Sequence, residues 1–207
     1  GRDWDDYVRI FIQMIDGNFL ERILSGNCGE ICTALARRTP LAPLLFGSLF
    51  VLGGSILVEI VLSLVFCCMN LAVYFIGSYW GRKTGVISVL LLSLSQPYVN
   101  LFHQIGSDSI YATLLVLFFF AGFQFINNKN YKMTTAISLI AFLAYFTRGT
   151  GQILFIFWPV ILLVLGLLGL RNFFRHILVF SSISAMLFLS WAGFLYIKTD
   201  NFKLNSS

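Results

Sequence analysis

The chain has 207 residues, of which 58% are hydrophobic and only 11% are charged. Soluble domains carry roughly 25% charged residues, so this composition excludes a water-soluble globular protein. It predicts an all-α fold, a polytopic transmembrane helical bundle. The net charge of +5 comes from small basic groups between apolar stretches, which is how membrane proteins set their orientation. It does not indicate nucleic acid as a partner.

Residues 1–54 are predicted to form an extracytoplasmic loop with juxtamembrane helices. Between residues 7 and 24 apolar side chains recur every three or four positions, which predicts an amphipathic helix in the membrane interface. A second apolar stretch, residues 41–52, ends at Gly53-Gly54 and is shorter than the roughly 20 residues that a span needs. We expect an interfacial or re-entrant segment there.

Cys28 and Cys32 lie in the same polar region. A disulfide, a metal site and no special role all remain open for this pair. The metal site is the least favoured of the three, because no His or further Cys lies nearby in the sequence.

Six spans are predicted between residues 55 and 196, followed by an extracytoplasmic tail at 197–207. They run over residues 55–79, 86–102, 110–126, 133–146, 152–170 and 177–196. The connections between them are short, so we expect consecutive helices to pack antiparallel.

Basic residues in alternate connections predict the orientation. One set of connections holds six of them, namely Arg82, Lys83, Lys129, Lys132, Arg171 and Arg175, whereas the opposite short turns hold only Arg148. The basic side is therefore predicted to be cytoplasmic. We expect an integral, multi-pass protein of the plasma or inner membrane, with the turns at 107–109 and 147–151 on the extracytoplasmic side.

Acidic residues open the chain on that predicted outer side. Asp3 and Tyr7 are four positions apart, so one helical face presents both. A carboxylate at this place could take a proton from an acceptor hydroxyl or amine during group transfer. The alternative is that Asp3, Asp5 and Asp6 stabilise a helix N-terminus, and both interpretations remain open.

Three more ionisable residues lie at predicted outer helix ends. Asp108 opens the third span, His103 precedes it, and Arg148 lies in a later turn. The planar guanidinium of an arginine can bind two phosphate oxygens, although Arg148 could simply extend to the membrane surface. Asp108 either caps its helix or adds a second carboxylate. We expect these residues and the N-terminal acids to converge on one outer cavity.

The order of these motifs resembles the GT-C superfamily of membrane glycosyltransferases, most closely the branch of protein O-mannosyltransferases and lipid A aminoarabinose transferases. The family's acidic motif, with Tyr four positions after Asp, is matched by Asp3 and Tyr7. An Arg-x-Pro-Leu-x-Pro-like segment is matched from Arg38 onward. A Ser-Asp motif that opens a span is matched at Asp108, and a Thr-Arg/Lys-Pro-Thr-Gly-like turn is matched around Arg148.

The resemblance implies transfer of a sugar, with inversion, from a polyprenyl- or dolichyl-phosphate-linked donor in the membrane. The acceptor, which is a protein, a lipid or a glycan, would receive it on the extracytoplasmic side. The resemblance would make Asp3 the general base and Arg148 a contact of the donor phosphate. The other substrate-binding residues would be Tyr7, Arg38, His103 and Asp108. No bound cofactor is implied, and a need for a divalent metal stays open.

Two residues depart from the family pattern: Glu59 stands where an Arg is common, and Gly149 replaces the usual Pro. Family members have eleven or more spans, one of them before the acidic motif. We therefore expect this chain to be an N-terminal fragment that is inactive alone.

Two other classes of protein remain as alternatives. In a multi-span transporter or flippase-like protein, the same charges would line a substrate path. Transporters, however, place ionisable residues near the bilayer midplane and carry internal repeats. In a non-catalytic assembly subunit, the outer charges would simply be solvated.

Overall fold

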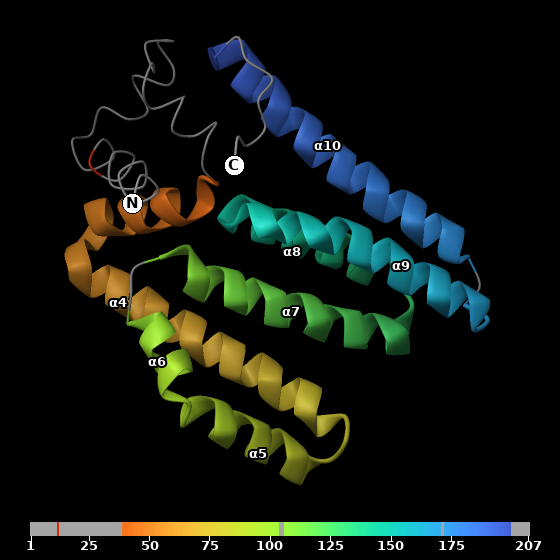
Figure 1. Cartoon of the computed structure of the whole chain (residues 1–207), viewed down its shortest axis with the longest axis horizontal. Helices are drawn as coiled ribbons and strands as arrows, with labels where there is room; N and C mark the ends of the chain where they lie inside the picture. Colours follow the sequence, from red (N-terminus) through yellow and green to blue (C-terminus); the bar gives the residue numbers. More distant parts are fainter. Residues whose placement is uncertain (1–11, 13–38, 104–105, 171, 200–207) are drawn as a thin grey trace. The chain divides into compact units, whose positions relative to one another are not determined.

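The computed structural model describes residues 12, 39–103, 106–170 and 172–199, and every regular element within these ranges is a helix (Figure 1). The elements are α4 (Leu41–Ser78), α5 (Arg82–Ser93), α6 (Gln96–Phe102), α7 (Ser107–Asn128), α8 (Tyr131–Thr147), the 3-10 helix η1 (Gly149–Gln152), α9 (Ile153–Leu167) and α10 (Phe173–Thr199). The chain forms two compact units, residues 1–61 with 187–207 and residues 62–186. Each unit is described by itself.

Several helices have the length and composition of membrane spans. Four qualify, namely α4, α7, α9 with η1, and α10, and a fifth is present if the bent pair of α5 and α6 is one span. Large apolar side chains stay exposed along these helices, among them Leu64 and Phe75 on α4 and Leu163 and Leu167 on α9. Surfaces of this kind are covered by lipid or by a partner. The all-helical fold is confirmed for the described residues, with four or five helices long and apolar enough to cross a membrane, whereas the predicted count of about six spans is not reached by these criteria.

The apolar stretch 41–52 forms the first part of α4. A kink follows at Gly53 and Gly54, where Gly54 has a φ of 65°, a conformation that glycine adopts at no steric cost. The glycine pair thus interrupts the helix where the sequence predicted an end, whereas the interfacial or re-entrant placement is not confirmed. Apart from Ile12, the amphipathic segment 7–24 and the cysteine pair at 28 and 32 lie outside the described residues.

The predicted second span, 86–102, is broken into two helices. The axes of α5 and α6 differ by 72°, and Ser95 between them has an extended backbone with ψ of 106°. Pro97 lies in the first turn of α6, where its missing N–H costs no helical hydrogen bond. The proline is therefore well accommodated where the new helix begins.

α8 is shorter than a typical span. Its 17 residues extend over about 25 Å, against a hydrocarbon core of roughly 30 Å. The Asn130 side chain caps its start and accepts a hydrogen bond from the Met133 N–H at 2.8 Å. Lys129, with a φ of 45°, ends the preceding helix α7. This two-residue connection makes α7 and α8 antiparallel neighbours, as predicted.

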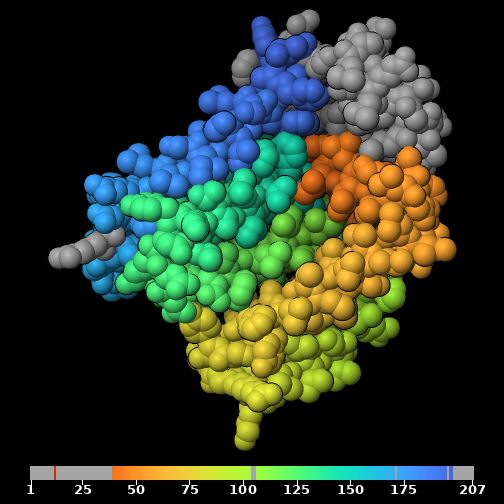
Figure 2. Space-filling view, turned by 180° about the vertical axis from the view of Figure 1, so that it is seen from behind, coloured from red at the N-terminus to blue at the C-terminus, as the bar shows by residue number. Residues whose placement is uncertain are grey.

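The core of the 62–186 unit is formed by α7, α8, α9 and the first part of α10. On α8, Ala141 and Ala144 are fully buried, and such small residues let membrane helices approach closely. Trp158 of α9 packs edge-on against Phe125 of α7, with ring centroids 5.4 Å apart. The space-filling view from the opposite side shows α7 and α8 (green to teal) packed side by side (Figure 2).

Hydroxyl groups set the register between α8 and α10. The Thr134 hydroxyl lies 2.8 Å from His176 Nδ1, and the Ser138 hydroxyl lies 2.9 Å from that of Ser184. All four side chains are buried. Because both residue numbers rise together from one contact to the next, α8 and α10 run in the same direction.

α4 and α7 also run in the same direction. The Thr113 hydroxyl contacts Met69 Sδ at 3.7 Å, and the Tyr79 hydroxyl donates to the Phe123 carbonyl at 3.3 Å, each pair being 44 positions apart. Within this unit α5, α8 and α10 therefore start at one end, whereas α7 and α9 start at the other (Figure 1). The basic connections share the first end, and the turns that carry Asp108 and Arg148 share the second.

Candidate functional site

Two of the predicted site residues are in contact. Arg148 Nη1 donates a hydrogen bond to Asp108 Oδ1 and forms an ion pair with it. The two side chains are 50% and 54% exposed, respectively. The pair joins the end of α8 to the start of α7, so the antiparallel packing of these helices creates it.

Asp108 lies in the first turn of α7. The preceding Gly106 is extended and occupies the cap position. The next residue, Ser109, is buried, and its hydroxyl lies 3.4 Å from the Gly106 carbonyl. A carboxylate in a first helical turn is stabilised by the positive end of the helix dipole. Asp108 therefore does not cap α7, because Gly106 is the cap residue and no side chain accepts a capping hydrogen bond there. What remains of that interpretation is the favourable interaction of its charge with the helix dipole.

Arg148 ends α8 in an extended conformation, with a φ of −154°. Its N–H still donates to the Ala144 carbonyl at 2.9 Å, and its carbonyl accepts from the Gly151 N–H at 2.8 Å. The preceding residue, Thr147, is fully buried, and its hydroxyl donates to the Leu143 carbonyl at 2.8 Å. The backbone of Arg148 is thus fixed on both sides while its side chain remains half exposed.

Gly151 closes this turn against the end of α8. A Cβ atom at this position would lie 2.5 Å from the Tyr145 nitrogen and 2.7 Å from the Ala144 oxygen. Both are backbone atoms, which cannot move aside as the end of a flexible side chain can. The tight turn therefore requires a glycine, a requirement that the motif alone did not reveal.

The helix dipoles stabilise the charges of both residues, whereas the ion pair itself adds little to the stability of the fold. Arg148 lies at the negative end of α8 and Asp108 at the positive end of α7, so each helix dipole stabilises its own charge. An exposed ion pair of this kind contributes at most about 1 kcal/mol to stability. Nη1 of Arg148 is the atom that contacts Asp108, and a guanidinium has five N–H donors in all. The arrangement thus leaves capacity to bind an anion.

Among the described residues, the other predicted site residue, His103, forms no hydrogen bond or ion pair with Asp108 or Arg148. His103 follows the last residue of α6 and is exposed, and its backbone N–H donates to the Asn100 carbonyl at 3.2 Å. Asp3, Tyr7 and Arg38 lie outside the described residues. Within the ranges that the structure describes, no three His, Cys, Asp or Glu side chains form a group that could hold a metal ion.

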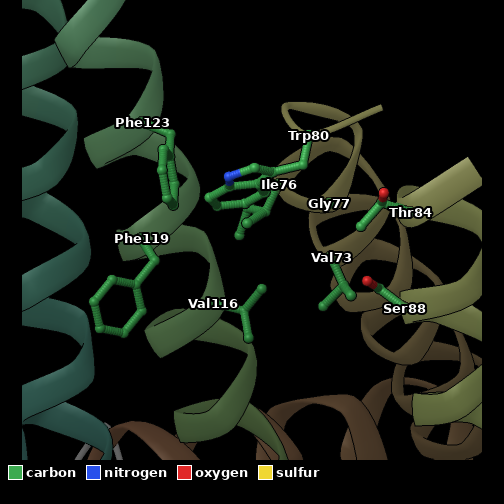
Figure 3. A pocket seen from close by; sticks show the side chains of 9 residues that line it. All are labelled: Val73, Ile76, Gly77, Trp80, Thr84, Ser88, Val116, Phe119 and Phe123. Atoms are coloured by element: carbon green, nitrogen blue, oxygen red, sulfur yellow. The ribbon is translucent and has the colours of Figure 1, made fainter. Parts of the chain in front are cut away.

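A groove lies toward the basic end of the 62–186 unit, away from Asp108. It is formed by the end of α4, by α5 and by α7, and has a volume of about 330 Å³. Figure 3 shows Val116, Phe119 and Phe123 on one wall and Thr84 and Ser88 on another. Sequence patterns did not indicate this groove, because its walls are ordinary apolar helix faces.

Comparison with protein-family models, with curated proteins and with solved structures finds no match for this chain. The resemblance to GT-C glycosyltransferases therefore depends on the sequence motifs.

Proposed function

We propose that this chain is part of a GT-C-type membrane glycosyltransferase, which transfers a sugar from a polyprenyl- or dolichyl-phosphate-linked donor to an acceptor on the extracytoplasmic side. The observation that supports this proposal best is the half-exposed ion pair of Arg148 with Asp108. It lies at the helix ends opposite the basic connections (Figure 1). A positioned guanidinium at a membrane surface is suited to a lipid-linked phosphate.

The proposed topology has six crossings. The bent pair of α5 and α6 is one of them, and α8 is a short one. α8 falls about 5 Å short of the hydrocarbon thickness, a mismatch that local thinning of the bilayer accommodates at modest cost. The exposed Lys132 in its first turn can extend its ammonium group to the headgroups. The positive-inside rule then places Asp108 and Arg148 outside.

In the proposed reaction the acceptor oxygen or nitrogen attacks the anomeric carbon of the donor while the bond from that carbon to the phosphate oxygen breaks. Asp3 takes the proton of the acceptor. The polyprenyl phosphate that leaves carries one more negative charge than the donor, and Arg148 stabilises this charge. Asp108 holds the guanidinium in position between turnovers. Because the attack is direct, the configuration at the anomeric carbon is inverted.

The test uses the full-length protein in proteoliposomes with polyprenyl-phosphate mannose labelled in the sugar. Arg148→Ala is expected to lower transfer roughly 100-fold, because two charge-assisted hydrogen bonds to the departing phosphate are worth about 3 kcal/mol or more. The matched control is Arg175→Ala, an exposed arginine in the first turn of α10 at the opposite helix ends. This control should retain transfer within about twofold, as expected for a surface charge.

The general base is tested in the same assay. Asp3→Asn should abolish transfer with normal expression, whereas Asp16→Asn, on the polar face of the predicted amphipathic helix, should not. Transfer that survives in Asp3→Asn would remove Asp3 from the mechanism. Uptake of a solute into the vesicles without any transfer would favour the transporter alternative.

A further inference from the structure

The apolar groove and the basic start of α5 together point to a lipid. We propose that the groove holds one acyl chain of an anionic glycerophospholipid, whose phosphate is bound by Arg82 and Lys83. This site is independent of the proposed transferase activity, because it lies at the opposite end of α7 from Asp108.

The walls of the groove suit a hydrocarbon chain. Val73 and Ile76 of α4 face Val116 and Phe119 of α7 across it (Figure 3). Its volume of about 330 Å³ is roughly that of ten water molecules in the liquid. Seven of its nine lining residues have no hydroxyl or charged group, so it offers water few hydrogen-bond partners. In a membrane, an acyl chain is the apolar molecule adjacent to such an opening.

The direction of the groove fits a chain that enters from the membrane surface. Phe123, Phe119 and Val116 follow one another along α7 from its end toward its middle. On α5, Thr84 and Ser88 are one turn apart and continue in the same direction. The groove thus extends from the basic end of the unit toward the centre of the helices, over roughly 10 Å.

Positive charge at the mouth of the groove favours a lipid with an anionic headgroup. Arg82 and Lys83 are exposed and directly precede Thr84 in the first turn of α5. Gly81 occupies the cap position of α5 without a side-chain hydrogen bond to the first N–H groups. Two cations next to a helix N-terminus attract phosphate, and no acidic residue lies in this turn. A zwitterionic lipid gains less here, because its own cation opposes Arg82 and Lys83.

Trp80 provides a probe at the mouth. Its side chain lines the groove and is 68% exposed, and its ring lies 5.7 Å from that of Phe123. A variant that keeps Trp80 but carries Trp4→Phe, Trp158→Phe and Trp191→Phe reports on this place alone. It is reconstituted in phosphatidylcholine that contains a small fraction of lipid with brominated acyl chains.

At the same bulk fraction, brominated phosphatidylglycerol should quench Trp80 fluorescence more strongly than brominated phosphatidylcholine. The difference should correspond to a roughly tenfold higher local concentration of phosphatidylglycerol, because each basic residue adds to the binding free energy of an anionic lipid. Arg82→Gln with Lys83→Gln should remove this preference. The variant with Lys129→Gln and Lys132→Gln, the matched basic pair at the connection of α7 and α8, should keep this preference. Equal quenching by the two lipids, or loss of the preference in the Lys129 and Lys132 variant, would overturn the proposal.

A variant that fills the groove distinguishes binding of the acyl chain from binding of the headgroup. Val116→Phe should lower quenching by both lipids, whereas Val160→Phe, on an exposed face of α9, should leave it unchanged. The unmodified chain provides a second measurement with a phosphatidylglycerol that carries a diazirine in one acyl chain. Its crosslinks should map to α5 and the second half of α7. Crosslinks spread evenly over all helices would contradict a defined site.

Discussion

Arg148 at the end of α8 is paired with Asp108 in the first turn of α7, 40 positions earlier in the chain. The two-residue connection between these helices makes them antiparallel neighbours, so the start of α7 and the end of α8 lie toward the same side. The helical hairpin thus makes the pair possible, and the Arg148 side chain completes it. Its half-exposed position leaves it accessible to a ligand.

The first prediction concerns the crossing of α8. Thr150 and Asn128 lie in the turns at either end of the α7–α8 hairpin and are both exposed. With the native cysteines replaced by serine, Thr150→Cys should react with a membrane-impermeant maleimide on intact cells. Asn128→Cys should react only after the membrane is opened. Labelling of both cysteines from the same side would show that α8 does not cross the membrane, and would contradict the extracytoplasmic position of the ion pair.

The second prediction concerns Gly151. Because a Cβ atom there would meet the backbone of Ala144 and Tyr145, Gly151→Ala should shift the turn and displace Arg148. We expect the free energy of unfolding to fall by about 1–3 kcal/mol. We also expect the affinity for the lipid-linked donor to fall, because Arg148 is displaced. Thr150→Ala, an exposed neighbour in the same turn, is the control and should change neither. Wild-type donor binding in Gly151→Ala would contradict the account of the turn.

The third prediction concerns the close approach of α4 and α5. A Cβ atom on Gly85 would lie 2.7 Å from the Tyr74 carbonyl oxygen, and one on Gly77 would lie 2.9 Å from the Gly85 Cα. Gly85→Ala should therefore lower the midpoint of unfolding in detergent. The matched change Gly193→Ala meets no described atom within 4 Å and should raise the midpoint slightly, because alanine is the better helix former. Equal effects at the two sites would be evidence against the packing.

Sequence patterns were sufficient to predict most of the helices and to expect Asp108 and Arg148 at the same ends of their helices, but not their direct ion pair. Apolar runs separated by short polar turns determine which helix ends meet, and both residues lie at such helix ends. The bend at Pro97 was not predicted, because prolines also occur inside straight membrane helices. The contacts of Thr134 with His176 and of Ser138 with Ser184 were missed as well. Single hydroxyls within apolar runs do not reveal which neighbouring helix they face.

In the proposed reaction Arg148 binds the donor phosphate, and a charge reversal tests this role most directly. Asp108→Arg combined with Arg148→Asp preserves an ion pair between the same helix ends but moves the cation to the start of α7. If the pair acts in catalysis, the double variant should keep the amount of folded protein seen for the wild type and still lack sugar transfer from polyprenyl-phosphate mannose. Recovery of transfer to near the wild-type level would show that the pair is only structural and would contradict the proposed function.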